Sequence, residues 1–414
     1  MRSVLTIAVL ALMAFPVLLW PSQASAQRSG GTEAGPSQEA VAAASGASAF
    51  GLNLFRSLAA RDGNLFMSPV SVAGVLAMAY AGAAGDTASA FEGALGMPAK
   101  GEAYLKSWKG LEDSLKAASG EGSELSLAGS MWPDGSVKLK RDFLRTVERS
   151  FGARIEPQDF AGGGDAPREA INAWAARETR DRVKDLIPMP LPPDTRLVLA
   201  NAVYFKGGWL EPFDKAETRE GRFQAAPKRV TASFMRRTGP FGYLEDELGQ
   251  VLEIPYRGRR LSMFVLLPAS ASGGMASLEA SLAGETLAAR IGKASMERVD
   301  ASLPRFSFGW GTESLLDPLS ALGLAPAFGG GADFSGMTGD RSLKISDVLH
   351  RAFVDVTEEG TEAAAASAAV ITRALPAFEP PKVFKADRPF VFLIRDRESG
   401  AILFMGRVTD PTAS

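Results

Sequence analysis

The sequence of 414 residues contains no cysteine and a single histidine, His350. Without cysteine there can be no disulfide, thiolate nucleophile, zinc–thiolate site or iron–sulfur cluster. One imidazole also excludes metal sites built from several histidines. The charges nearly cancel, with 45 Lys and Arg against 47 Asp and Glu, so no charge excess favours nucleic acid or an anionic membrane. We therefore expect no metal, no cofactor and no nucleic-acid partner.

Residues 1–26 are typical of a secretory signal peptide. A positively charged start precedes an almost wholly apolar run over 4–20, and the segment 24–26 (Ala-Ser-Ala) offers a small–x–small cleavage site. The alternative is an uncleaved anchor, because the run is near the lower limit for a spanning helix. Pro16 and Pro21 favour cleavage. The sequence predicts an exported protein, secreted or periplasmic, with no membrane association after cleavage.

The rest of the chain divides into a short leader and one large domain. Residues 27–38 are rich in glycine, serine and small polar residues, which predicts a disordered leader. Residues 39–411 mix helix and strand signals without a long linker or a repeat. The clearest patterns are a helical spacing of apolar residues over 171–186, strands over 261–267 and 301–308, and a hairpin of 390–394 with 402–405.

Recognisable catalytic motifs are absent from the sequence. No serine lies in a G-x-S-x-G or S-x-x-K pattern, and the glycine runs 162–164 and 329–331 lack the Gly-Lys-Ser/Thr ending of a phosphate loop. His350 could act as a catalytic base, but its apolar, alternating surroundings favour a hydrogen-bonded core residue. The sequence argues against an enzyme.

The segment 358–372 carries conflicting local signals. Its alanine-rich part, 363–369, favours a helix, because alanine is the best helix former. The same part lacks the polar residues of a solvated helix face, and it ends in 370–372 (Val-Ile-Thr), which prefers a strand. As a strand, it would present small side chains that can enter a sheet without overpacking. Both an exposed helix and a loop-to-strand switch remain open from the residues alone.

Motifs along the whole chain, from about residue 40 to 411, resemble those of the serpin family, and in the family's order. They are 64–71 (NLFMSPVS), 197–209 (LVLANAVYFKGGW, the central strand of the largest sheet), 345–356 (ISDVLHRAFVDV), 358–369 (the hinge of the reactive-centre loop), 384–394 (FKADRPFVFLI) and 404–408 (FMGRV). Together they resemble an exported, bacterial-type, inhibitory member.

The resemblance implies an α+β fold with three β-sheets, roughly nine helices and an exposed, metastable reactive-centre loop over about 358–382. In the family a serine protease attacks the loop, and after acylation the cut loop inserts into the central sheet and traps the enzyme. Small inward-facing hinge residues are typical of inhibitory members, and this chain has Thr361, Ala363, Ala365 and Ser367 there. The alternative is a non-inhibitory binding or chaperone module. The implied hinge comprises Glu358, Glu359, Gly360, Thr361, Glu362, Ala363, Ala364, Ala365 and Ala366.

The resemblance also assigns two groups of residues where the sheet must open. His350 matches the histidine of the shutter, which is expected to bond with Asn201, Ser68 and Ser71. Glu358 and Trp209 match the breach, the place where insertion begins.

Counting seventeen residues from Glu358, as the family does, puts the reactive bond at Ala374–Leu375. A small residue before the cut suits elastase-like or subtilisin-like proteases. A loop shorter by one residue would instead use Arg373–Ala374, which suits trypsin-like proteases. The helical candidate 104–116 mixes lysines with acids, so we expect no heparin-binding patch, and we expect a monomer.

Overall fold

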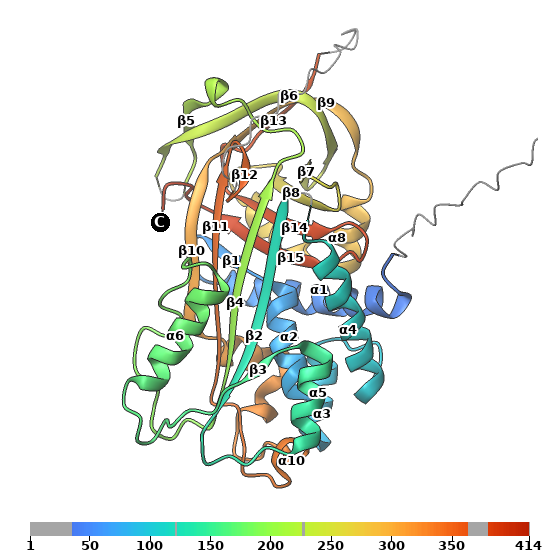
Figure 1. Ribbon diagram of the computed structural model, residues 1–414. Coiled ribbons are helices and arrows are strands. Elements are labelled where there is room, and N and C mark those ends of the chain that lie inside the picture. The colour runs from blue at the N-terminus through green and yellow to red at the C-terminus, as the bar shows by residue number, and fades with distance from the viewer. Residues whose placement is uncertain (1–34, 121, 226–227, 363–379, 414) are drawn as a thin grey trace, which may run out of the picture. The chain divides into compact units, whose positions relative to one another are not determined.

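Two hydrogen-bonded networks of strands organise the residues that the computed structural model describes, which are 35–120, 122–225, 228–362 and 380–413 (Figure 1). One network has six strands and the other nine. From Gly35 onward the chain is one compact unit. None of the helices within these ranges is long and apolar enough to cross a membrane.

The six-stranded sheet carries the motifs singled out in the sequence. Its central strand β4 pairs antiparallel with β2 along its whole length and parallel with the first half of β11. Toward the other end of β11, the short strand β12 lies between β11 and β4 and pairs with both. The order across the sheet is β10 (Phe306–Ser314), β11 (Asp347–Thr357), β12 (Gly360–Thr361), β4 (Leu197–Gly208), β2 (Ser123–Pro133) and β3 (Arg154–Ile155).

The nine-stranded network explains why the expected three sheets are joined into two. Strand β6 is 17 residues long and pairs in turn with β5, β9 and β7, so it belongs to two sheets at once. The predicted largest sheet, that of β4, therefore has fewer strands than this network. Its strands are β1 (Leu65–Met67), β15 (Ile402–Val408), β14 (Phe390–Asp396), β8 (Leu261–Pro268), β7 (Gly249–Pro255), β6 (Val230–Asp246), β9 (Ser295–Pro304), β13 (Lys382–Lys385) and β5 (Arg219–Phe223).

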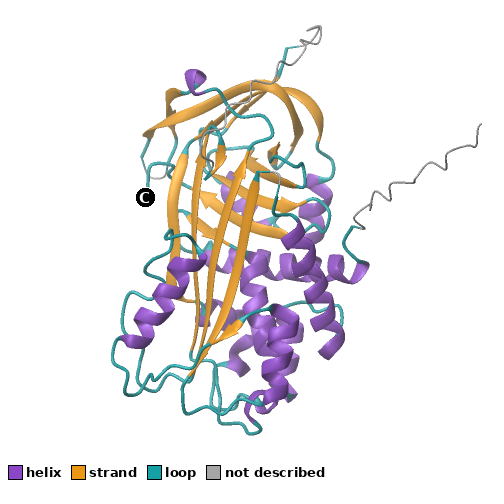
Figure 2. Ribbon diagram, viewed as in Figure 1, coloured by secondary structure: helices purple, strands orange, loops and turns teal. Residues whose placement is uncertain are grey.

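Helices cover both faces of the six-stranded sheet (Figure 2). Helix α6 packs Ile171 and Trp174 against Val198 and Ala200 of β4, and on the opposite face β4 packs with α1 and α2 into the larger core. Because both faces are covered, β4 reads as a nearly continuous apolar run. The described α-helices are α1 (Gln38–Leu58), α2 (Pro69–Tyr80), α3 (Gly85–Ala94), α4 (Gly101–Ala117), α5 (Arg141–Phe151), α6 (Ala166–Glu178), α7 (Gly274–Ala280), α8 (Gly284–Ile291), α9 (Leu316–Leu319) and α10 (Ser335–Thr338).

Two local predictions were wrong at their boundaries. The helix expected over 171–186 ends at Glu178, because Arg180 and Asp181 adopt positive φ angles of 52° and 63° that a right-handed helix does not allow. The apolar residues beyond this break are still buried, which explains the misleading periodicity. The strand expected over 301–308 is divided at Arg305 between β9 and β10, which lie in different sheets.

Candidate functional site

His350 lies at the centre of a buried polar cluster with Asn201 and Ser68. His350 and Asn201 are register partners on the parallel strands β11 and β4, and the imidazole Nδ1 lies 2.6 Å from Asn201 Oδ1. The backbone N–H of Ser68 donates to Nε2 over 3.3 Å. Since an accepting ring nitrogen carries no proton, the neutral imidazole must carry its proton on Nδ1 and donate it to Asn201. The surrounding groups therefore select one tautomer.

Burial keeps this imidazole neutral. His350 is only 1% exposed, and its desolvation lowers the pKa from the ordinary 6.5 to about 3. A general base works best with a pKa near the operating pH, and both nitrogens of this ring already have structural hydrogen-bond partners. The geometry supports the core-residue interpretation of His350.

Ser71 joins the cluster through its neighbours and not through the imidazole. The Asn201 amide donates to Ser71 Oγ and, over 3.3 Å, to the Ala128 carbonyl oxygen on β2. Ser68 caps helix α2, since its Oγ accepts from the Ser71 N–H at 3.3 Å, and the same hydroxyl donates to the Leu403 carbonyl oxygen at 2.6 Å. The expected direct bond from His350 to Ser71 is thus replaced by two indirect links. Sequence reasoning missed Ala128 and Leu403 because they contribute only backbone oxygens.

The beginning of the hinge is part of the sheet. Gly360 and Thr361 form β12, pairing with Gly208 and Gly207 of β4 on one side and with the end of β11 on the other. The reactive-centre loop was expected to be exposed from about residue 358, but Glu358 and Thr361 are each 2% exposed. Backbone pairing on both sides, which the sequence does not reveal, accounts for this difference.

Two glutamates fix the approach to β12. The Glu358 carboxylate accepts a 2.7 Å hydrogen bond from Thr218 Oγ1 and lies 3.7 Å from the Arg305 Nε. The Glu359 carboxylate is paired with Lys215. Because each glutamate also accepts a backbone N–H at its carbonyl oxygen, the segment is held by main chain and side chain together.

Trp209 and Tyr256 form a stacked aromatic pair that contacts the hinge. Their rings stack at 4.6 Å between centroids, and Trp209 Nε1 donates to the Thr357 carbonyl oxygen over 3.0 Å. The Tyr256 hydroxyl lies 2.8 Å from Thr361 Oγ1. Trp209 also donates its backbone N–H to the Glu359 carbonyl oxygen at 2.9 Å. The structure therefore brings Trp209 and the hinge together, and it adds Tyr256, which no sequence motif indicated.

Gly360 is required where β12 meets β4. Its φ of 148° is one that L side chains rarely adopt, and a Cβ atom there would lie 2.0 Å from the Gly207 carbonyl oxygen. Only glycine permits such a close backbone approach. The pairing of β12 therefore depends on this residue.

The remaining predicted site residues lie outside the described residues. These are Ala363, Ala364, Ala365 and Ala366 of the hinge, together with Arg373, Ala374 and Leu375 at the expected reactive bond. Within the described ranges, no cluster of His, Asp and Glu is arranged to hold a metal ion.

A family model described as serpin (serine protease inhibitor) matches residues 45–411. The chain belongs to the serpin family. This serpin is 38% identical over 316 residues to an uncharacterized serpin-like protein of Thermococcus kodakarensis, an alignment that covers 76% of this chain and 73% of the relative. It is 37% identical over 296 residues to the leukocyte elastase inhibitor of Sus scrofa, covering 69% and 78%.

Solved structures agree with the family assignment. Human thyroxine-binding globulin, in a crystal structure with thyroxine, matches with a TM-score of 0.79 and 28% identity, covering 90% of this chain and 100% of that one. The predicted α+β serpin fold is confirmed. In this serpin, the polar cluster at His350 lies within the paired stretch of β4 and β11, and Trp209 directly follows the end of β4 where β12 pairs.

Proposed function

We propose that this serpin is a suicide inhibitor of serine proteases that traps the acyl-enzyme by inserting its cleaved loop between β4 and β11. The observation that carries the proposal is β12. The hinge already pairs as an antiparallel strand with both neighbours, so the backbone groups that a longer inserted strand needs are aligned with it. We further propose that the protein acts after export, outside the cytoplasm, as a monomer.

The register of β12 shows what continued insertion would require. Thr361 lies opposite Gly207 on β4 and Val356 on β11, so each further residue would meet the preceding residue of both strands. In that register, Ala363, Ala365 and Ser367 would lie opposite Phe205, Val203 and Asn201 of β4.

Small side chains fit these positions, because Phe205 and Val203 already fill the core on that face. On the β11 side, the same register places Ser367 opposite His350. Insertion would therefore separate His350 from Asn201 and put a hydroxyl between them. This requirement gives the shutter a direct part in the proposed mechanism.

The choice of target rests on the loop and on the relatives. The leukocyte elastase inhibitor is named for an elastase, and the small Ala374 at the expected reactive bond suits an elastase-like or subtilisin-like enzyme. Thyroxine-binding globulin, by contrast, is a serpin-fold protein described by its ligand, which keeps a non-inhibitory binding role as the second candidate.

One experiment separates the two candidates. The mature protein is mixed separately with elastase, trypsin and subtilisin, and the products are resolved on denaturing gels and by mass spectrometry. We expect a complex that survives denaturant, and a released peptide beginning at Leu375. A peptide beginning at Ala374 would move the bond to Arg373 and the target to trypsin-like enzymes. Cleavage by every protease without a complex would reject the inhibitor proposal in favour of the non-inhibitory one.

Cleavage should also raise thermal stability. We expect the loop-cleaved protein to melt at least about 10 °C above the intact protein, because roughly ten more residues would gain ladder hydrogen bonds worth about 1 kcal/mol each. Calorimetry before and after limited proteolysis tests this. An unchanged melting temperature would show that the sheet does not accept the loop.

A further inference from the structure

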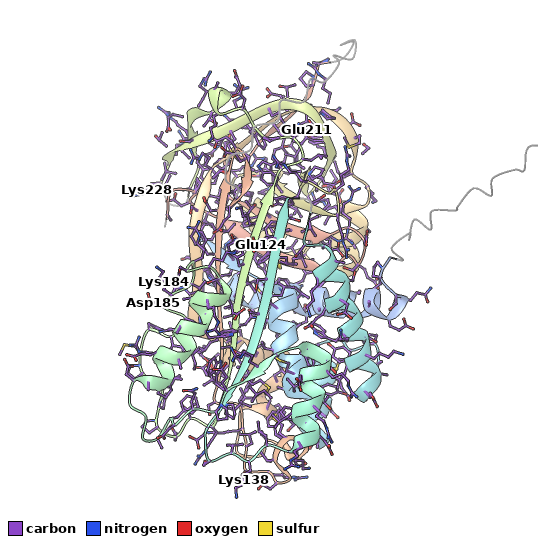
Figure 3. The ribbon with its side chains drawn as sticks, in the orientation of Figure 1. Glu124, Lys138, Lys184, Asp185, Glu211 and Lys228 are labelled. Atoms are coloured by element: carbon purple, nitrogen blue, oxygen red, sulfur yellow. The ribbon has the colours of Figure 1, made fainter. Side chains whose placement is uncertain are left out.

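Two arginines that follow helix α6 contact the strands on either side of the gap between β4 and β11, into which β12 extends. Arg180 and Asp181 both have positive φ angles, 52° and 63°, which are uncommon for residues other than glycine. The positive φ angles of these two residues end the helix and direct the side chains of Arg180 and Arg182 toward the sheet. We call the segment Arg180–Arg182 the clasp. Its neighbours Lys184 and Asp185 lie beside α6 in Figure 3, and Glu124 lies on the sheet.

The two arginines of the clasp contact different sides of the β4–β11 interface. Arg180 pairs with Glu124 of β2, and its guanidinium lies 5.6 Å from the ring centre of Tyr204 on β4. Arg182 lies 5.5 Å from the ring centre of Phe353 on β11, and its Nε is 3.2 Å from Glu362 Oε1. The clasp thus bridges the strands that insertion has to separate, and it holds the residue that follows β12.

Glu362 directly follows β12 and is the last described residue of the hinge. Its backbone has a φ of 50°, and its N–H donates to the Asp355 carbonyl oxygen on β11 at 2.8 Å. Its side chain is only 3% exposed, and its Oε1 lies 3.2 Å from the Arg182 Nε. Burial raises the pKa of Glu362, while Arg182 opposes that shift. The residue is therefore in a strained backbone conformation with a buried charge that Arg182 compensates.

We propose that Arg182 and Glu362 are positioning residues that hold β12 in the sheet, and that their separation precedes insertion of the cleaved loop. The direction of the effect follows from burial. Without Arg182, the Glu362 carboxylate loses its compensating cation and gains by moving to water, and this movement withdraws the adjacent Thr361 from the sheet. Removing the charge on Glu362 as well removes that tendency.

The absence of cysteine gives a direct measurement of this movement. In a Thr361→Cys variant, the introduced thiol is the only one in the chain, and the side chain it replaces is 2% exposed. We expect Arg182→Gln to raise its rate of reaction with a soluble disulfide reagent about tenfold. Arg177→Gln is the matched control, since Arg177 lies on α6 and pairs with its neighbour Glu178. It should change the rate less than about twofold.

A second background, carrying Glu362→Gln, distinguishes a positioning role of Arg182 from a general weakening of the packing around the hinge. When Glu362→Gln is present, Arg182→Gln should change the thiol rate by less than about twofold, because no buried charge remains to be compensated. Equal acceleration in both backgrounds would contradict the proposal, since it would mean that the substitution only weakens packing. An unchanged rate with Glu362 present would contradict it as well.

The expected effect of Arg182→Gln on the rate of complex formation rests on the proposed inhibitory function, whereas the thiol measurement uses no protease. If the thiol result holds, Arg182→Gln should also change the rate of complex formation with elastase by several-fold, because the loop starts from a different position. A positive thiol result without any complex would retain the positioning pair and reject the inhibitory function.

Discussion

We expect arginine in place of Thr361 to convert the proposed inhibitor into a substrate that the protease cleaves and releases. Thr361 is 2% exposed in β12, its Oγ1 lies 2.8 Å from the Tyr256 hydroxyl, and its strand partner is Gly207. A guanidinium at this position would lose that contact and would have to be buried at a cost of roughly 3–5 kcal/mol. Insertion would then be slower than deacylation. We expect the fraction of protease trapped to fall at least about tenfold, which corresponds to about 1.4 kcal/mol.

Two further variants make this prediction specific. Thr361→Ser keeps a hydroxyl near Tyr256 and should retain inhibition. Thr231→Arg adds the same charge on an exposed position of β6 and should have no effect. The measurement is the ratio of inhibitor to protease needed for complete inhibition. If Thr361→Arg still forms stable complexes at the wild-type ratio, the inserted strand does not bury this position.

Removal of the imidazole in His350→Ala should lower the melting temperature at neutral pH and promote association between molecules. The substitution leaves Asn201 Oδ1 and the Ser68 N–H without partners in a buried site, and it also creates a cavity. Together these effects should cost about 2–4 kcal/mol. Thermal unfolding and size-exclusion chromatography measure the two outcomes. A variant as stable as the wild type would show that the cluster contributes nothing to closing the sheet.

The size of this loss should depend on pH. His350 has a pKa of about 3 when folded and 6.5 when unfolded, so between these values the unfolded chain binds a proton that the folded protein does not. In the wild type, this difference removes up to about 1.4 kcal/mol of stability per pH unit as the pH falls below 6.5. The variant has no histidine and lacks this contribution. The gap between the two proteins should therefore narrow from pH 7 to pH 4, and a constant gap would contradict the buried, neutral state.

The sequence was most informative where local chemistry and motif order coincide. The hairpin of β14 and β15 and strand β8 lie where apolar patterns and turn residues predicted them, and strands β4 and β11 lie in motifs that resemble those of the family. The residues of the shutter could be named because their motifs resemble those of the serpin family. Their connections could not be derived, since they run through backbone oxygens such as that of Leu403.

The insertion of the hinge and the clasp were likewise beyond sequence reasoning. Pairing of Gly360 and Thr361 with β4 depends on contacts between residues about 150 positions apart, which leave no local signal. The contact of Arg182 with Glu362 depends on positive φ angles at Arg180 and Asp181, residues that normally avoid them. Periodicity instead suggested that the helix continued through this point.

Ser68 binds the start of helix α2, the ring of His350 and the carbonyl oxygen of Leu403, and this arrangement has a consequence for biosynthesis. Leu403 lies 335 positions beyond Ser68 in the chain, in the last strand, β15. Contacts between such distant positions form late, because a long loop must close first. A nascent chain cannot complete the cluster before β15 has left the ribosome, so the Ser68 hydroxyl gains this partner only once that strand is available.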